Sequence, residues 1–289
     1  MSDIKDFNCT YDNSVGISED VTKELNLEFP EAYKYWESMA DIARALKRHD
    51  GADFCELPFC HTVEAEAMGG IVNYGNEKIG PRAKEYICTD IEELLALPEI
   101  DYSQGRIHEV LLACRHLREQ GENVVLEVAG PFTILNVLID ARYVFKGMRK
   151  KPEVMKKVYE KFGKEILHYL EEAQKYGVNL ISYADSSGGV NILGPKAAGQ
   201  VVEEFTYPFL KEVEALIGKE AIVLLCPKTT LALLGTDKAE FTDVELEEPM
   251  RYGQACVDLI GKEKFAGQMC IKNIEYRLEN KKIKAVRLL

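Results

Sequence analysis

Short apolar runs alternate with longer amphipathic stretches through the middle of the chain. The runs at 123–128, 179–184 and 221–225 have the length of strands buried on both faces. Between them, apolar residues recur every three or four positions, which predicts helices. Strands joined by helices pair in parallel. The pattern therefore favours an α/β fold of the (β/α)8 barrel (TIM barrel) type, whose functional side chains gather where the strands end.

The two ends of the chain follow a less regular pattern. Apolar positions between 21 and 48 predict two helices broken at Pro30. We therefore expect one domain made of an N-terminal helical extension, 1–50, and the barrel, 51–289. Near the C-terminus, 241–249 and 264–270 read as strands, and the residues around Glu279 and Asn280 predict a terminal hairpin.

Amino-acid composition and net charge argue against some classes of binding partner. The chain has 289 residues, a hydrophobic fraction of 46% and a net charge of −12, which argues against binding a nucleic-acid backbone. We expect no membrane span, since no apolar run approaches the roughly 20 residues that a bilayer requires. The first residues are neither basic nor apolar, so we expect a cytoplasmic protein. A homodimer is compatible with this sequence.

Three reactive side chains and one glycine lie at or just after the ends of predicted strands. Gly130 follows the first of the three runs, Asp185 the second and Cys226 the third, while Cys270 ends the predicted strand at 264–270. In a reducing cytoplasm the eight cysteines are free thiols or metal ligands, and thiolates suit zinc. Asp185 is a candidate for proton transfer or substrate orientation. Cys114 lies among apolar helical positions and reads as a core residue.

A second concentration of candidate chemistry lies in the segment 54–70. It combines thiols, an imidazole and carboxylates, including His61 and Glu64. Either residue could line a site. Alternatively, Glu64 is a solvated residue in the first turn of a helix, where the helix dipole favours acids.

Four segments carry a family resemblance. They are TVEAEAMGG at 62–70, EVAGPFTIL at 127–135, YADSSGGVNILGPKAAGQVVEEFTYPFLKEV at 183–213 and IVLLCPKT at 222–229. In this order they resemble the uroporphyrinogen decarboxylase superfamily, and within it the cobamide-dependent methyltransferases. The resemblance implies a (β/α)8 barrel that moves a methyl group between a corrinoid (cobamide) on a partner protein and a small molecule, such as a methylated donor or a thiol or folate acceptor.

The resemblance also assigns candidate roles. It implies a catalytic role for Asp185 and zinc ligands Cys226 and Cys270, and Glu64 in the segment 54–70 is a second candidate catalytic residue. The candidate substrate-binding residues are His61, Gly130, Tyr183 and Ser186. One position departs from the family pattern, because Leu224 stands where the His-x-Cys motif of this branch has its zinc-binding histidine. Zinc would then need another ligand, such as His61 or Glu64.

Two other functions remain open at this stage. A uroporphyrinogen decarboxylase-like lyase would need no cofactor, but the arginine motif that holds its polyanionic substrate does not occur near this N-terminus. A non-catalytic barrel that binds a corrinoid or its carrier protein is the other alternative, suggested by the lost histidine.

Overall fold

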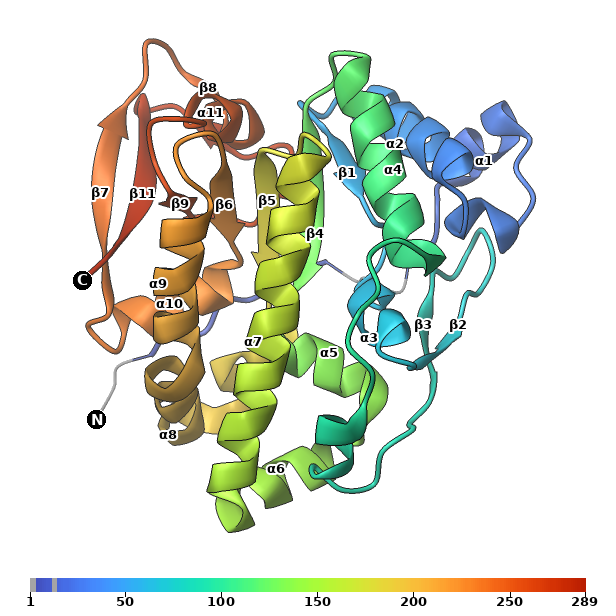
Figure 1. Ribbon diagram of the computed structural model, residues 1–289. Coiled ribbons are helices and arrows are strands. Elements are labelled where there is room, and N and C mark those ends of the chain that lie inside the picture. The colour runs from blue at the N-terminus through green and yellow to red at the C-terminus, as the bar shows by residue number, and fades with distance from the viewer. Residues whose placement is uncertain (1–3, 12–14) are drawn as a thin grey trace.

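A seven-stranded sheet forms the centre of the molecule. The structure is a computed structural model that describes residues 4–11 and 15–289. Within that part of the chain the strand order is β1-β4-β5-β6-β9-β11-β7 (Figure 1). The first five are parallel and β11 runs antiparallel to both of its neighbours. The strands are β1 (Cys55–Leu57), β4 (Val124–Ala129), β5 (Leu180–Ala184), β6 (Ile222–Leu225), β7 (Ala239–Glu245), β9 (Phe265–Ala266) and β11 (Lys282–Leu288).

Helices cover the sheet where the periodicity predicts them. In Figure 1, α4, α7 and α9 stand in front of the parallel strands. The helices are α1 (Glu19–Leu25), α2 (Trp36–Asp50), α3 (Val63–Ala67), α4 (Gly105–Glu119), α5 (Pro131–Leu138), α6 (Ala141–Lys150), α7 (Pro152–Lys175), α8 (Val190–Val201), α9 (Tyr207–Leu216), α10 (Pro227–Leu234) and α11 (Tyr252–Asp258). Single turns occur at η1 (Glu31–Tyr33), η2 (Glu93–Ala96), η3 (Ser186–Gly188) and η4 (Val202–Thr206).

The parallel strands bury both of their faces. Leu126, Ile181 and Val223 belong to the cluster that packs against the helices. The residues that precede them, including Val125 and Ile222, belong to a second cluster on the opposite face. We call this opposite face the inner face. Helix α11 packs against this inner face, so side chains of the same chain form the core there.

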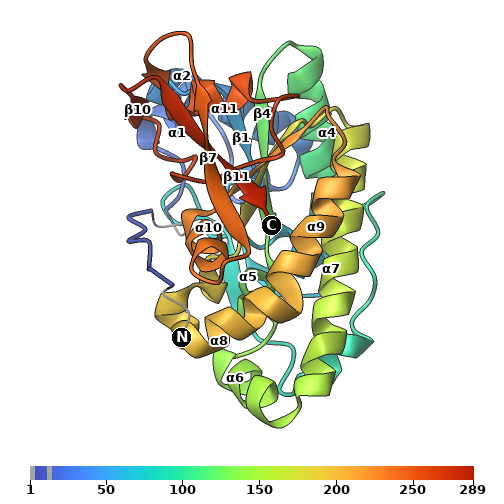
Figure 2. The same ribbon diagram turned by 90° about the vertical axis from the view of Figure 1, so that its left-hand side faces the viewer.

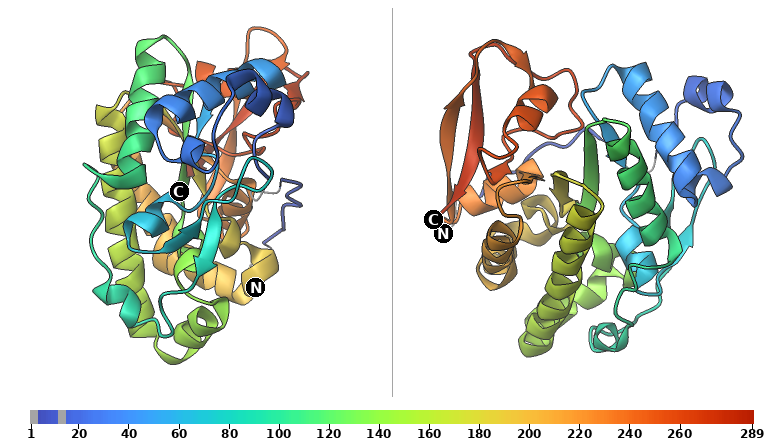
Figure 3. Two further views of the ribbon diagram at one scale, coloured as in Figure 1. Left: turned by 90° about the vertical axis from the view of Figure 1, so that its right-hand side faces the viewer. Right: turned by 45° about the horizontal axis from the view of Figure 1, so that its top comes forward.

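The N-terminal helices form a separate small core. Val21, Tyr33 and Ile42 pack together in a cluster of their own, and α2 lies against α4 and β1. Figure 3 shows α1 and α2 on the side of the molecule away from β7. Pro30 lies between α1 and η1, so the predicted break between the helices is confirmed.

Outside the main sheet, β2 (Ile71–Asn73) and β3 (Arg82–Glu85) form an antiparallel hairpin. The prediction of a terminal hairpin around Glu279 and Asn280 is wrong. Of its two halves, β10 (Arg277–Leu278) pairs with β8 (Met250–Arg251), and β11 pairs with β7 and β9 (Figure 2).

The reason for the error is burial. Ile283, Ala285 and Val286 are buried in β11, which pairs with β7 along its whole length and with β9 at Ala285. The strand expected at 264–270 is also shorter than predicted, since β9 ends at Ala266. In the described part of the chain, no helix has the length and apolar character needed to cross a membrane.

Ile283 tests whether β11 is an integral part of the sheet. Its side chain is fully buried in the inner-face cluster. We expect Ile283→Ala to lower the free energy of unfolding by about 2–4 kcal/mol, and the matched Ile283→Val by about 1 kcal/mol. Urea denaturation measures both. A loss below about 1 kcal/mol for the alanine variant would mean that β11 contributes little to the folded core.

Candidate functional site

The end of β5 divides the predicted site residues between two cavities. Successive side chains of a strand point to opposite faces. Ser182, Ala184 and Ser186 line a cavity on the inner face, of about 50 Å³. Tyr183 and Asp185 line a smaller one, of about 20 Å³, that is also bordered by α8 and α10.

The cavity on the inner face lies at the carboxyl ends of the parallel strands, and we call it the strand-end cavity. It unites four of the predicted residues: His61, Ser186, Cys226 and Cys270. Its other polar and reactive residues were not predicted from the sequence; they are Cys9, Tyr11, Glu127, Ser182 and Lys272. Cys9 and Tyr11 come from the N-terminal segment, so residues distant in sequence complete the lining.

Asp185 is held by the first turn of α5. The backbone N–H of Thr133 donates to Asp185 Oδ1 at 2.8 Å, and the Thr133 hydroxyl contacts the same oxygen at 3.1 Å. Burial nevertheless raises the pKa of Asp185 from 3.8 to about 6, because desolvation outweighs these hydrogen bonds. The carboxylate therefore stabilises the start of a helix and titrates near neutral pH.

Gly130 makes room for Asp185. A Cβ at residue 130 would lie 2.3 Å from the Cβ of Asp185 and 2.8 Å from the Tyr183 hydroxyl. The ring of Tyr183 in turn packs beside Phe209 of α9, with 5.5 Å between centroids. In this structure Gly130 therefore permits the close approach of β4 and β5, and Tyr183 belongs to the helix-side core.

Glu64 completes the hydrogen bonding of β4. Strand β1 ends at Leu57, opposite Leu126, so it does not reach the last residue of β4. The backbone N–H of that residue, Ala129, donates to Glu64 Oε1 at 2.8 Å. Glu64 is 3% exposed and its burial raises its pKa. It is therefore a buried residue of α3 and lies outside the residues that line the two cavities.

Lys272 links two acidic residues on the inner face. Its ammonium lies 2.9 Å from Glu56 Oε1 and 3.0 Å from Glu127 Oε1. Burial opposes the charged form of the lysine, but the two carboxylates outweigh burial and raise the pKa of Lys272. Burial also raises the pKa of both glutamates. A carboxylate within the apolar run VVLEVA was the sequence signal for this cluster, because a charge at such a position needs a partner.

Burial favours the uncharged forms of His61, Cys226 and Cys270 in the strand-end cavity. Burial, with a smaller effect of Lys272, lowers the pKa of His61 to about 4, so the ring is uncharged. Burial raises the pKa of Cys270 to about 12 and also raises that of Cys226. Cys226 precedes α10, and the backbone N–H groups of Lys228 and Thr229 point to its sulfur and partly offset this rise.

The donors in this cavity do not fit a zinc site as they are arranged. Structural and catalytic zinc sites use at least three protein donors. Across residues 4–11 and 15–289, no group of three or more His, Cys, Asp or Glu side chains is placed to hold a metal ion. Leu224, at the position of the expected histidine, is buried and packs in the inner-face cluster.

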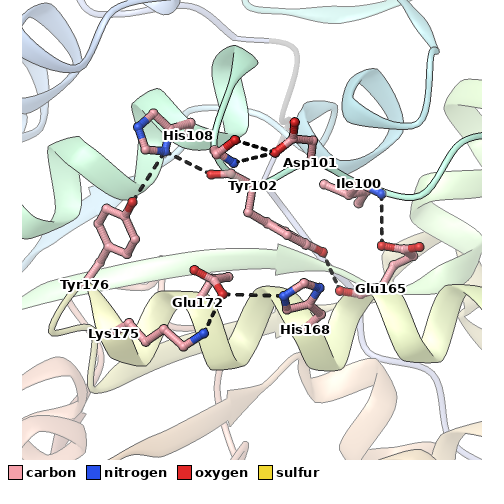
Figure 4. A network of polar contacts seen from close by, with 10 residues as sticks. Ile100, Asp101, Tyr102, His108, Glu165, His168, Glu172, Lys175 and Tyr176 are labelled. Atoms are coloured by element: carbon pink, nitrogen blue, oxygen red, sulfur yellow. Dashed lines mark hydrogen bonds and ion pairs between the residues drawn. The ribbon is translucent and has the colours of Figure 1, made fainter.

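His108 of α4 and His168 of α7 lie in a network of polar contacts between these two helices (Figure 4), and neither lines the strand-end cavity. His108 Nδ1 lies 2.9 Å from the carbonyl of Tyr102, whose hydroxyl donates to the Glu165 carbonyl at 2.6 Å. His168 lies 3.4 Å from Glu172. These contacts tie the segment before α4 to α7. Cys114 is fully buried on α4, as predicted.

Comparison with known sequences identifies the family. A profile of the uroporphyrinogen decarboxylase (URO-D) family matches residues 16–263, which is most of the chain. The chain therefore belongs to the uroporphyrinogen decarboxylase family. The resemblance carried by the four sequence segments is confirmed.

Relatives of known activity come from the cobamide methyltransferase branch of the family. The methylcobamide:CoM methyltransferase MtaA of Methanosarcina barkeri is 25% identical over 228 residues, which cover 78% of this chain and 66% of the relative. The methylcobamide:CoM methyltransferase MtbA of Methanosarcina acetivorans is 23% identical over 226 residues, covering 76% and 65%. The chain thus spans about two thirds of the length of these relatives.

A solved structure supports the fold. A methyltransferase from Methanosarcina mazei matches with a TM-score of 0.64 and 21% identity, over 78% of this chain and 68% of that chain. The predicted TIM-barrel fold of the family is thereby confirmed. In this chain the described sheet keeps five parallel strands and ends in the antiparallel pair β11 and β7.

The pKa of Asp185 predicts a pH effect on stability. The folded state binds this proton more tightly than the unfolded state, so the contribution is present below about pH 4 and lost as pH rises through about 6. Between about pH 5 and 7 we expect the wild type to lose about 1 kcal/mol more stability than Asp185→Asn. Urea denaturation across this range measures the difference.

Asp258→Asn serves as a control because Asp258 is exposed, and its pH profile should follow the wild type. Parallel profiles for wild type and Asp185→Asn would show that Asp185 titrates outside this range.

The contact between Glu64 and Ala129 predicts different costs for two substitutions. Glu64→Ala removes the acceptor of a buried N–H, and we expect it to lower the free energy of unfolding by about 1–3 kcal/mol. Glu64→Gln retains an oxygen acceptor and should cost less. Thermal or urea unfolding compares the two. Equal costs would show that the charge of Glu64, rather than its hydrogen bond, stabilises the fold.

Proposed function

We propose that this protein is a methyltransferase that moves a methyl group between a corrinoid carried by a partner protein and a small-molecule donor or acceptor. The observation that carries the proposal is the similarity to methylcobamide:CoM methyltransferases over 76–78% of the chain. The matched family region, 16–263, includes the strand ends that bring Cys226 and Ser186 to one cavity.

The chemistry of the strand-end cavity suits a small polar substrate. The polar side chains that line the cavity include Glu127 and Ser182 from the sheet and Lys272 from the loop after β9. Leu224 and Ile271 supply apolar surface beside them. Such a mixture of apolar walls and few polar groups is typical of small-molecule sites. The cavity volume of about 50 Å³ corresponds to a small group, so a substrate would insert one end here.

In methyl transfer to a thiol, the sulfur is the nucleophile and needs unobstructed access to the methyl group. The sulfur lone pair forms the new S–C bond while both electrons of the Co–C bond remain on cobalt, and the thiol proton is released to solvent. This chain would orient the acceptor beside the methyl group, since positioning alone contributes strongly to such displacements. In the reverse direction the same positioning would serve a methylated donor.

The acidic character of the site disfavours decarboxylation of a porphyrinogen. Glu56 and Glu127 outnumber the single ammonium that joins them. A substrate with many carboxylates requires several fixed cations to hold it, as arginine clusters do in anion sites. We therefore propose methyl transfer ahead of the lyase.

A methyl-transfer assay with purified protein tests this function. Methylcob(III)alamin is mixed with a panel of thiols, or cob(I)alamin with methylated donors, and the corrinoid spectrum and the methylated products are followed. We expect a rate at least about tenfold above the protein-free mixture, and a loss of about tenfold or more in Cys226→Ser, because its sulfur lines the cavity.

Cys114→Ala is the matched control, since this thiol is buried on α4, and it should retain the wild-type rate. Turnover of uroporphyrinogen without methyl transfer would instead support the lyase. Corrinoid binding with no methyl exchange across the whole panel would support a binding role.

A further inference from the structure

The inner face of the sheet carries its own fixed cation. The Lys272 ammonium contacts Glu56 of β1 and both carboxylate oxygens of Glu127 of β4, at 2.9–3.1 Å. The side chain of Glu127 is 2% exposed and that of Lys272 22% exposed. A charge buried in this way is retained only where opposite charges compensate it. The three residues therefore act as one unit, which we call the Lys272 cluster.

The Lys272 cluster adjoins the place where the family pattern expects a zinc ligand. Strand register aligns Glu127 with Ser182, and Ser182 with Leu224, so one row of inner-face positions crosses three strands. Leu224, Cys226, Cys270 and Lys272 all line the strand-end cavity. Leu224, which stands where the family pattern has an imidazole, and Lys272, which carries an ammonium, therefore line the same small cavity.

We propose that the Lys272 ammonium is the resident cation of this cavity and takes the place of zinc. The inference rests on the proposed function and extends it, because it identifies the positively charged group of the same cavity. Two features carry it: the donor set lacks a third convergent ligand among the described residues, and an ammonium already pairs with both nearby carboxylates.

Electrostatics explains why both cations would not share the cavity. A divalent ion beside a fixed ammonium is repelled strongly, since the interior screens charges poorly. Removing the ammonium alone would leave two buried carboxylates without a counter-charge, which favours binding of another cation.

Metal binding in three proteins tests the proposal: the wild type, Leu224→His, and Leu224→His combined with Lys272→Met. Each is prepared under reducing conditions, exposed to zinc, dialysed and analysed for metal by mass spectrometry. We expect well below one zinc per chain in the first two, and about one in the double variant, where an imidazole is added and the ammonium removed. Cobalt(II) in place of zinc should give thiolate absorption in the double variant alone.

A fourth protein covers the risk that the double variant fails to fold. It adds Glu56→Gln and Glu127→Gln, which removes every charge of the Lys272 cluster while keeping the side chains nearly isosteric. It should still bind metal, but more weakly than the double variant, because the carboxylates no longer favour a cation. Adding Cys226→Ser to either metal-binding variant should abolish the cobalt spectrum.

Three results would overturn the proposal. The first is about one zinc per wild-type chain that Cys226→Ser removes. The second is stoichiometric zinc in Leu224→His alone, which would show that the ammonium does not exclude it. The third is a folded double or fourth variant without metal. None of these results depends on methyl transfer, so failure of this inference and failure of the proposed function are distinguishable.

Discussion

The ion pairs of Lys272 hold together three parts of the chain that are distant in sequence. Glu56 lies on β1, Glu127 on β4, and the lysine in the loop after β9. Breaking a buried pair by removing one partner costs about 3–5 kcal/mol, because the remaining charge lacks compensation. The C-terminal segment is thus anchored to the inner face by charge as well as by the apolar contacts of Ile271 and Ile283.

The alternation of side chains on β5 organises the chemistry around this anchor. Ser182 and Ser186 face the cavity that Lys272 lines, whereas Asp185 turns to the first turn of α5. Two groups adjacent in sequence are therefore separated by the sheet. This arrangement gives Asp185 a helix-capping contact and leaves the strand-end cavity to the thiols, His61 and the Lys272 cluster.

Membership of the uroporphyrinogen decarboxylase family accounts for the parallel half of the sheet and its helices, and the chain departs from a regular barrel after β6. There, β7 and β11 pair antiparallel, and α11 packs on the inner face. Parallel strands buried on both faces need cover on each side. In this chain α11 and the segment around Ile271 provide part of that cover.

The sequence by itself determined the parallel core, most of its helices and the family. These features depend on local periodicity and on contiguous segments, such as the apolar run ending at Ala184 and the amphipathic stretch of α7. The burial of Cys114 was likewise readable from its apolar neighbours. The sequence also exposed the departure at Leu224, because that position lies two residues from Cys226 within a matched motif.

Only the tertiary structure decided which residues share a cavity. The contact between Lys272 and Glu127 spans 145 positions, and no local pattern specifies a partner at that distance. The side that Asp185 faces depends on where β5 ends, since one residue of shift exchanges the two faces. The partners of β11 likewise depend on burial between β7 and β9, whereas local turn residues at Asn280 favoured a hairpin.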